Sequence, residues 1–185
     1  MAMQAGRLIV GADVAKAELV IHHDSSDEVI KLKNSKADLL MQKKMKEVLR
    51  EAGLHEQVAR CQAVEGIGFL TATALVMAFV RGEFKSSDSY IAFLGMDLRV
   101  SDSGQKAGRR RLTKRGCSEI RRLLHNAAMA ASKSTAWKGI YEQHRNSGKA
   151  TTQALVILAR KLARVAFALM KNQDEYVTKA SKPAC

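Results

Sequence analysis

The chain has few cysteines, few acidic residues and no long apolar run. Its three cysteines, Cys61, Cys117 and Cys185, are too few and too scattered for a disulfide framework or a zinc ribbon. The five histidines show no ligand spacing with them. The longest apolar run, residues 67–80, has the length of a buried helix and is too short to cross a bilayer. Disulfide scaffolds, zinc ribbons and membrane-spanning proteins are therefore excluded.

What the chain has in excess is positive charge. Its 31 Lys and Arg residues outnumber 18 Asp and Glu, which gives a net charge of +13 and predicts a polyanionic partner. With 185 residues, 46% of them hydrophobic, the chain can bury one core with a small appendage. The first residues lack the order of a signal peptide, so we expect a cytoplasmic protein that associates with the nucleoid and not with a membrane.

The positive charge is concentrated between Gly104 and Arg122. Eight basic residues face the single acid Glu119 there, namely Lys106, Arg109, Arg110, Arg111, Lys114, Arg115, Arg121 and Arg122. Glycines interrupt the run and predict a loop or short ribbon up to Gly116. Solvated charged faces normally mix both signs, so a run of one sign favours nucleic-acid binding.

A second candidate phosphate contact lies at Glu65-Gly66-Ile67-Gly68, directly before an apolar segment. Gly66 and Gly68 allow a tight turn whose backbone N–H groups point outward at the start of the next helix, where phosphate binds well. The pattern resembles the helix-hairpin-helix motif of DNA-binding proteins. An ordinary helix corner with a capping glycine is an equally good interpretation of the two glycines alone.

The remaining pattern predicts a mainly α fold. Residues 7–32 alternate as a small antiparallel β-meander, and residues 35–52 form an amphipathic helix. We assign residues 1–34 to the meander, 35–60 to a linker or coiled-coil-like helix, 61–171 to a helical C-terminal domain with the hairpin motif, and 172–185 to a mobile tail.

Within the helical domain, Ser87 or Asp88 is expected to cap a short helix over residues 89–94. Amphipathic helices are predicted over residues 118–133 and 151–170. In the last helix, Arg160, Lys161 and Arg164 are expected to face away from the core without acids to pair with.

Two residues are candidates for chemistry. Asp13, at the end of the first predicted strand, could bind a divalent cation or be a simple turn residue. Ser103 lies in Ser-Asp-Ser-Gly, a typical turn sequence, and a serine nucleophile needs an activating group that the neighbouring sequence does not supply.

The order of several short motifs resembles transposases of the insertion-sequence one-ten family, also called one-sixteen and nine-zero-two, which includes Piv-type DNA invertases. These motifs are Gly11-Ala12-Asp13-Val14-Ala15-Lys16, Glu65-Gly66-Ile67-Gly68, Phe93-Leu94-Gly95-Met96, Ser103-Gly104, Lys114-Arg115-Gly116-Cys117 and Arg121-Arg122-Leu123-Leu124. The resemblance covers nearly all of residues 7–170.

The resemblance implies an N-terminal RuvC-like nuclease domain with four metal-binding acids, a coiled-coil segment and a C-terminal domain with a reactive serine. Asp13 would correspond to the first metal acid, with Mg²⁺ as the cofactor, and Ser103 to the reactive serine. No segment matches the other three acids. We therefore expect a RuvC-like remnant, lacking the middle of the nuclease domain, that is catalytically incomplete by itself.

The resemblance also implies DNA transposition or site-specific inversion, guided in some members by a structured RNA. We expect DNA as the partner, with a guide RNA and a homo-oligomer or hetero-oligomer with full-length transposase as further partners. Two alternatives remain open: a non-catalytic DNA-binding regulator of a full-length transposase, and an RNA-binding protein.

Overall fold

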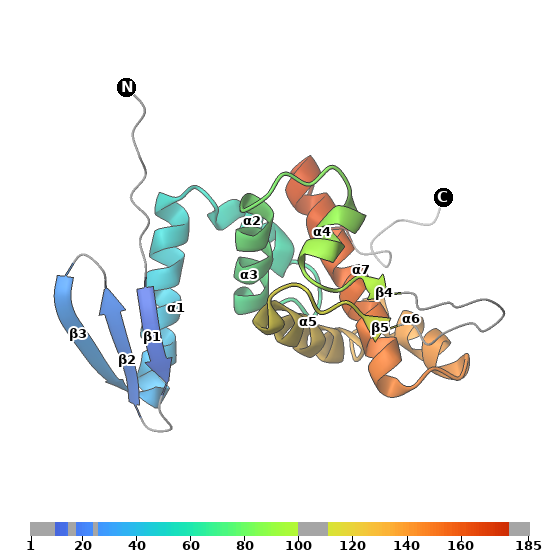
Figure 1. Cartoon of the computed structure of the whole chain (residues 1–185), viewed down its shortest axis with the longest axis horizontal. Helices are drawn as coiled ribbons and strands as arrows, with labels where there is room; N and C mark the ends of the chain where they lie inside the picture. The colour runs from blue at the N-terminus through green and yellow to red at the C-terminus, as the bar shows by residue number, and fades with distance from the viewer. Residues whose placement is uncertain (1–9, 15–17, 24–25, 100–110, 178–185) are drawn as a thin grey trace. The chain divides into compact units, whose positions relative to one another are not determined.

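A computed structural model describes residues 10–14, 18–23, 26–99 and 111–177, with side chains from Leu39 onward. The chain divides into two compact units, Met1–Gly53 and Leu54–Cys185, which are described separately. Helices dominate the described residues, so the prediction of a mainly α fold is confirmed (Figure 1).

The first unit is the predicted meander followed by a helix. Strands β1 (Val10–Val14), β2 (Glu18–His23) and β3 (Ser26–Lys33) pair antiparallel in the order β1-β2-β3. Helix α1 (Asn34–Glu51) packs against β2 and β3. A three-stranded sheet is marginal alone, so the helix supplies the second layer that it needs. Strand β3 begins close after β2, and Ser26 already pairs with His23.

The helix after the meander is shorter than the linker segment assigned from the sequence. Gly53 adopts a left-handed conformation with φ of +68°, and its N–H donates to the carbonyl of Arg50 at 3.0 Å. A left-handed glycine is a common helix end. A separate helix, α2 (His55–Gln62), follows and belongs to the second unit.

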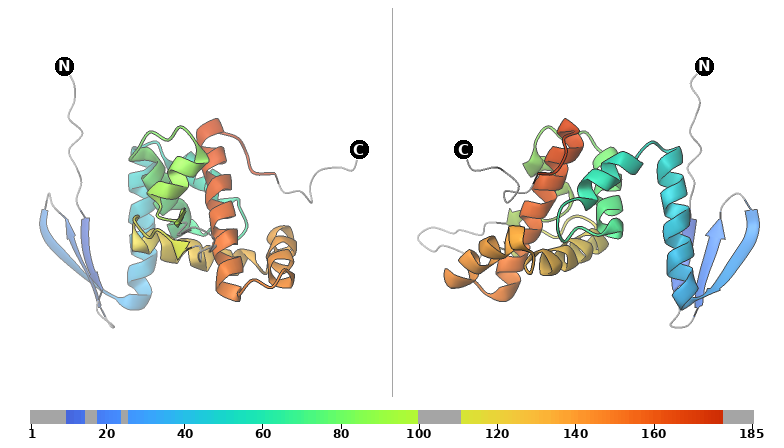
Figure 2. Two further views of the ribbon diagram at one scale, coloured as in Figure 1. Left: turned by 45° about the vertical axis from the view of Figure 1, so that its right-hand side comes forward. Right: turned by 180° about the vertical axis from the view of Figure 1, so that it is seen from behind.

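The second unit is a helical assembly around its last helix. In addition to α2 it contains α3 (Phe69–Val80), α4 (Ser87–Phe93), β4 (Leu98–Arg99), β5 (Arg111–Leu112), α5 (Ser118–Ala131), α6 (Thr135–Asn146) and α7 (Thr151–Asn172). Helix α7 contacts all five of α2 to α6, and Figures 1 and 2 show it running through the unit beside them.

The core follows the apolar stripes of the sequence. Leu158 and Leu162 of α7 and Leu124 of α5 are fully buried, as their spacing predicts. Small residues share these stripes, and Ala128, Ala159 and Ala163 are equally inaccessible. Because alanine extends only one carbon from the backbone, helices that meet at these positions can approach closely.

The start of α4 differs from its prediction. Ser86, not Ser87 or Asp88, is the N-cap: its side chain accepts from the N–H of Ser89 at 3.2 Å, and the Ser89 side chain returns to the Ser86 backbone. Asp88 is thereby left in the first helical turn, and its Oδ1 accepts from Nη2 of Arg164 at 2.7 Å. The expectation that Arg164 has no acid to pair with is therefore wrong, since its partner lies 76 residues earlier in the sequence.

An aromatic cluster joins α3, α4 and α7. Five of the chain's nine aromatic side chains contact one another there, and they are Phe79, Phe84, Tyr90, Phe93 and Phe167. Tyr90 is fully buried, and its hydroxyl donates to the carbonyl of Leu75 at 2.8 Å. Burial raises the pKa of Tyr90 above its ordinary range, so the hydroxyl stays protonated and remains a donor.

Substituting Tyr90→Phe tests this bond. Loss of a buried hydroxyl bond to a carbonyl that still has its helical partner should lower the free energy of unfolding by about 1 kcal/mol. Urea denaturation followed by circular dichroism measures the change. The control is Tyr141→Phe, which removes the same group from a half-buried position on α6. Equal stability of Tyr90→Phe and the wild-type protein would show that the bond contributes nothing net.

Candidate nucleic-acid interface

The connection between α2 and α3 is a tight turn, as the two glycines predict. The N–H of Ile67 donates to the carbonyl of Val64 at 3.0 Å, and Gly66 has φ of +91°. A positive φ at the third position of a hydrogen-bonded turn is typical of type II geometry. Val64 and Ile67 are both buried, so they anchor the two ends of the turn in the core.

The two glycines of the turn have different surroundings. A Cβ on Gly66 would lie 2.6 Å from the carbonyl oxygen of Ala127 and 2.6 Å from the Cβ of Ala131, so this glycine packs directly on α5. A Cβ on Gly68 would meet nothing within 4 Å. Gly68 is exposed at the N-cap of α3, which lacks a side-chain cap. Of the two predicted phosphate contacts, Gly68 is the one that a ligand can approach freely.

An acid also lies in this turn. Oε2 of Glu65 accepts from the hydroxyl of Tyr176 at 2.8 Å. Burial and this hydrogen bond raise the pKa of Tyr176 to about 12. The predicted tail thus contains a residue that bonds back to the glycine turn, and residues 178–185 lie outside the described part of the chain. The glycine turn consequently presents one carboxylate near any phosphate that it would bind.

Two further glycines hold the backbone of the basic region, just before α5, against the end of α4. Gly95 has φ of +69°, and a Cβ there would lie 2.4 Å from the backbone nitrogen of Gly116. A Cβ on Gly116 would lie equally close to the carbonyl carbon of Leu94. Nη1 of Arg121 donates to the carbonyl oxygen of Gly116. Arg121 thus helps to fix this crossing of the backbone, and its role as a DNA contact stays a prediction.

A short ribbon lies at the basic segment, for which the sequence predicted a loop or short ribbon up to Gly116, but one of its two strands, β4, comes before that segment. Strands β4 and β5 pair antiparallel, with Leu98 opposite Leu112 and Arg99 opposite Arg111. The backbone N–H of Thr113 donates to the carbonyl of Asp97 at 3.1 Å, and their side chains also hydrogen-bond. Two arginines directly opposite each other on neighbouring strands repel. Both side chains are exposed, so an anion can reach them and relieve this repulsion.

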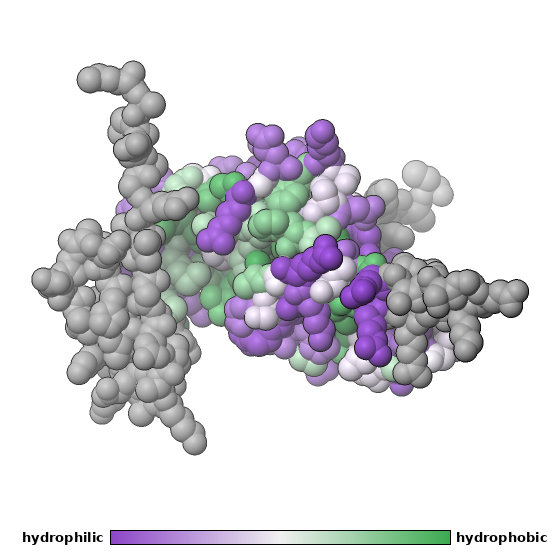
Figure 3. Space-filling view, viewed as in Figure 1, coloured by the Kyte–Doolittle hydropathy of each residue, from purple (hydrophilic) through white to green (hydrophobic). Residues whose placement is uncertain are grey.

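The turn after the ribbon adds two cations. Lys114 has φ of +56°, and both it and Arg115 are exposed. No acid among the described residues forms an ion pair with Arg99, Arg111, Lys114 or Arg115. We call these four residues the ribbon cations. Figure 3 shows hydrophilic side chains beside an apolar area over α3 and α4. Met77, Phe93 and Arg115 line a common pocket.

Arg122, another predicted contact, is partly neutralised. It forms an ion pair with Glu119 one turn away, in which Nε of Arg122 donates to Oε2 at 2.9 Å. The pair lowers the pKa of Glu119 and raises that of Arg122, so both stay charged. A phosphate would therefore compete with Glu119 for this arginine.

Four predicted residues, Ser103, Lys106, Arg109 and Arg110, lie outside the described residues. Conversely, the sequence did not single out Arg99 as a contact. It lies before the basic run, and only the strand register places it opposite Arg111. Arg160 and Lys149, which line a pocket beside the ribbon, were also missed. The sequence offered one signal for Arg99, namely that this basic residue lies a few positions before the predicted loop or ribbon.

Asp13 lies within β1, opposite Val20 on β2. Among the described residues there is no group of three or more His, Cys, Asp or Glu side chains that could hold a metal ion. The side chains around Asp13 lie outside the described part of the chain, so its role as a Mg²⁺ ligand stays a prediction. A two-metal nuclease site needs several acids, and we derive no step through the ion.

None of the helices in the described part of the chain has the length and apolar character needed to span a membrane.

Residues 58–145 match the family model of a transposase domain, and this match gives the class of the protein. This segment includes the glycine turn, helices α3 to α5 and all four ribbon cations. The chain belongs to the transposase IS116/IS110/IS902 family, which confirms the resemblance of its motifs.

A curated relative gives the same family. The chain is 31% identical over 131 residues to the transposase for insertion sequence element IS1111A of Coxiella burnetii (strain RSA 493 / Nine Mile phase I). The alignment covers 68% of the chain and 36% of the relative. The chain thus spans about a third of the relative's length.

The pair Gly66→Ala and Gly68→Ala tests the roles of the two turn glycines. Gly66→Ala should lower the free energy of unfolding by more than about 2 kcal/mol, because alanine is strained at positive φ and its Cβ would enter α5. Gly68→Ala should change it by less than about 0.5 kcal/mol, because the site is open. Urea denaturation measures both, and similar losses in the two variants would contradict the packing role of Gly66.

Proposed function

We propose that the helical unit binds DNA as part of an insertion-sequence transposase, in DNA transposition or site-specific inversion. The observation that supports this most is the set of ribbon cations: four exposed basic side chains on one ribbon and its turn, without acid partners among the described residues. Phosphate contacts of this kind provide most of the sequence-independent affinity for nucleic acid.

The hairpin is proposed as a second, smaller contact. The first N–H groups of any helix lack acceptors within that helix, and the exposed Gly68 lets a phosphate approach those of α3. Glu65 reduces the electrostatic gain at this position. The ribbon therefore makes the larger contribution, and the predicted Lys106, Arg109 and Arg110 would extend it.

The proposal also has a catalytic side, in which Ser103 is the family's reactive serine. We propose that the chain binds DNA but does not complete strand cleavage by itself, because Asp13 is the one nuclease acid with a matching motif. Pairing with a full-length transposase, use of Mg²⁺ and a structured guide RNA, and association with the nucleoid in the cytoplasm are parts of the same proposal.

The salt dependence of DNA binding tests the role of the ribbon. Fluorescence anisotropy with a labelled duplex, repeated over a series of salt concentrations, gives the slope of log affinity against log salt. Replacing Arg99 and Arg111 together with alanine should reduce this slope by about two, since each lost phosphate contact removes roughly one released counterion. Competition with a structured RNA in the same assay separates DNA binding from RNA binding.

The matched control is Lys85→Ala with Lys171→Ala. This double variant removes the same charge at a distant place. Arg160 lies beside the ribbon, and Lys171 lies roughly 16 Å further along α7, where it hydrogen-bonds to the carbonyl of Lys85. Its salt slope should match that of the wild-type protein. If both double variants lower the slope equally, binding depends on net charge alone and the ribbon is not the interface.

A cleavage assay tests the catalytic part. Supercoiled DNA with the element's ends is incubated with the protein and Mg²⁺, using the wild-type chain, Ser103→Ala and Asp13→Ala. We expect binding by all three proteins and no strand-transfer or cleavage product from any of them. A product that disappears in Ser103→Ala would show instead that this chain has a complete site.

A further inference from the structure

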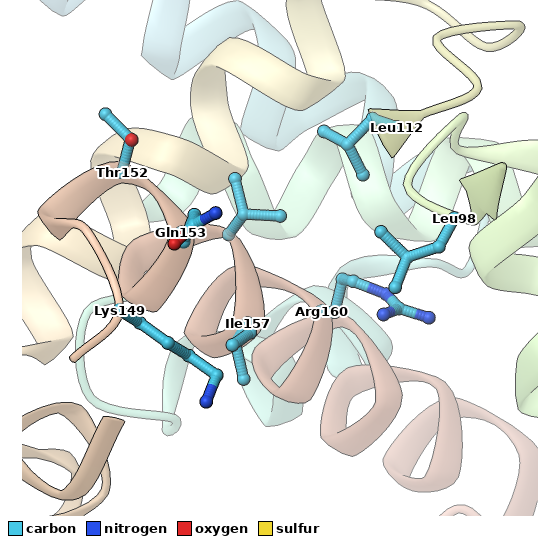
Figure 4. Close-up of a pocket in the computed structure, with 8 residues that line it drawn as sticks. Leu98, Leu112, Lys149, Thr152, Gln153, Ile157 and Arg160 are labelled. Atoms are coloured by element: carbon cyan, nitrogen blue, oxygen red, sulfur yellow. The ribbon is translucent and has the colours of Figure 1, made fainter. Parts of the chain in front are cut away.

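A pocket of about 390 Å³ lies between the ribbon and α7. One wall is formed by Leu98 of β4 and Leu112 of β5, and the other by the first turns of α7 (Figure 4). Its volume is within the range of small-molecule sites. The cavity is separate from the ribbon cations, which are exposed on the surface.

The pocket combines aliphatic walls with positive charge. Leu98, Leu112, Val156 and Ile157 supply the apolar surface, and Lys149 and Arg160 supply two cations. Thr152 and Gln153 are polar members of the lining. None of the described residues that line it is acidic. The occupant suited to this lining has an apolar body and at least one negative charge.

Arg160 is held in an environment that favours such an anion. Its Nε atom is buried and has no hydrogen-bond partner among the described residues. Figure 4 shows the side chain extended from α7 toward Leu98. Burial is the main cause that lowers the pKa of Arg160, and the neighbouring charge of Arg164 adds to it. The charges of Asp88 and Asp97 act on Arg160 in the opposite sense, but Asp88 is hydrogen-bonded to Arg164 and Asp97 to Thr113.

The strand register relates the pocket to the proposed DNA surface. Each leucine that lines the pocket is next in sequence to an exposed arginine. Leu98 precedes Arg99, and Leu112 follows Arg111. Neighbouring residues of a strand point to opposite faces. The arginines therefore lie on the face of the ribbon opposite the pocket, and a nucleic-acid strand held by them would have to pass over an edge of this two-residue ribbon for one of its nucleotides to reach the pocket.

We propose that this pocket receives an unpaired nucleotide, with its base against the four aliphatic side chains and its phosphate on Lys149 and Arg160. The inference rests on the proposed binding of nucleic acid. A base in a duplex is stacked and paired and cannot enter a pocket, whereas a phosphate alone would leave the aliphatic walls without a partner. Unpaired bases can also stack on an arginine plane, which Arg160 offers.

Three probes distinguish this pocket from general phosphate binding. They are a fully paired DNA duplex, the same duplex with one bulged thymidine, and the same bulge without its base. The wild-type protein should bind the bulged duplex about tenfold more tightly than the other two, because only this probe offers a base to the pocket. Fluorescence anisotropy at fixed salt measures all three affinities.

The matched variants are Thr152→Glu and Thr151→Glu. Both place an acid in the first turn of α7, where it favours the helix, but only Thr152 lines the pocket. Thr152→Glu should abolish the tenfold preference for the bulge, and Thr151→Glu should retain it. Arg160→Ala is a second pocket variant with the same expected loss, and a thermal melt of each protein confirms that it is folded.

Each outcome decides the inference. A preference that survives both Thr152→Glu and Arg160→Ala, or equal binding of the bulges with and without a base, overturns the pocket assignment while DNA binding stands. Equal affinity of the wild-type protein for all three probes does the same. If no probe binds at all, the proposed function fails and the pocket assignment fails with it.

Discussion

The helical unit depends on the burial of α7 by five other helices. Small and aliphatic residues cover most of its circumference, and Leu158, Leu162 and Ala163 are completely inaccessible. Close packing of this kind requires side chains of fixed size, so the helix cannot shift without opening cavities. On one side of α7, Val156, Ile157 and Arg160 line the pocket that lies between this helix and the ribbon. The helix that forms the centre of the core therefore also supplies one wall of the pocket.

Two backbone contacts then connect the surface turns to this core. At Gly66 the hairpin lies on α5, and at Gly95 the end of α4 lies on Gly116. Neither contact leaves space for a Cβ, so these glycines serve packing as well as turn geometry. Charged turns are otherwise costly to order, because each fixed residue loses conformational entropy. The contacts at Gly95 and Gly116 hold the backbone next to Arg115, which prearranges the cations for an anionic partner.

Local patterns of the sequence predicted what local physics determines. The apolar stripes identified α5 and α7, and the run of one-signed charge identified the basic ribbon. Contacts between distant residues could not be predicted in this way. Asp88 pairs with Arg164, and Gly66 packs on Ala131, only because the tertiary fold brings them together. Arg99 gained its importance from a register that composition does not reveal. The packing role of Gly66 could not be predicted either, because its partners on α5 lie far away in the sequence, and its role as a phosphate contact stays a prediction.

The opposition of Arg99 and Arg111 implies that binding and ribbon order are coupled. In the free protein the two like charges weaken a ribbon of only two residue pairs. Leu98, Leu112 and the bonds between Thr113 and Asp97 must hold the strands together against this repulsion. A phosphate between the arginines changes the sign of the interaction, since both cations then attract the same anion. We therefore expect the ribbon to be more stable with a phosphate bound between the two arginines than without one.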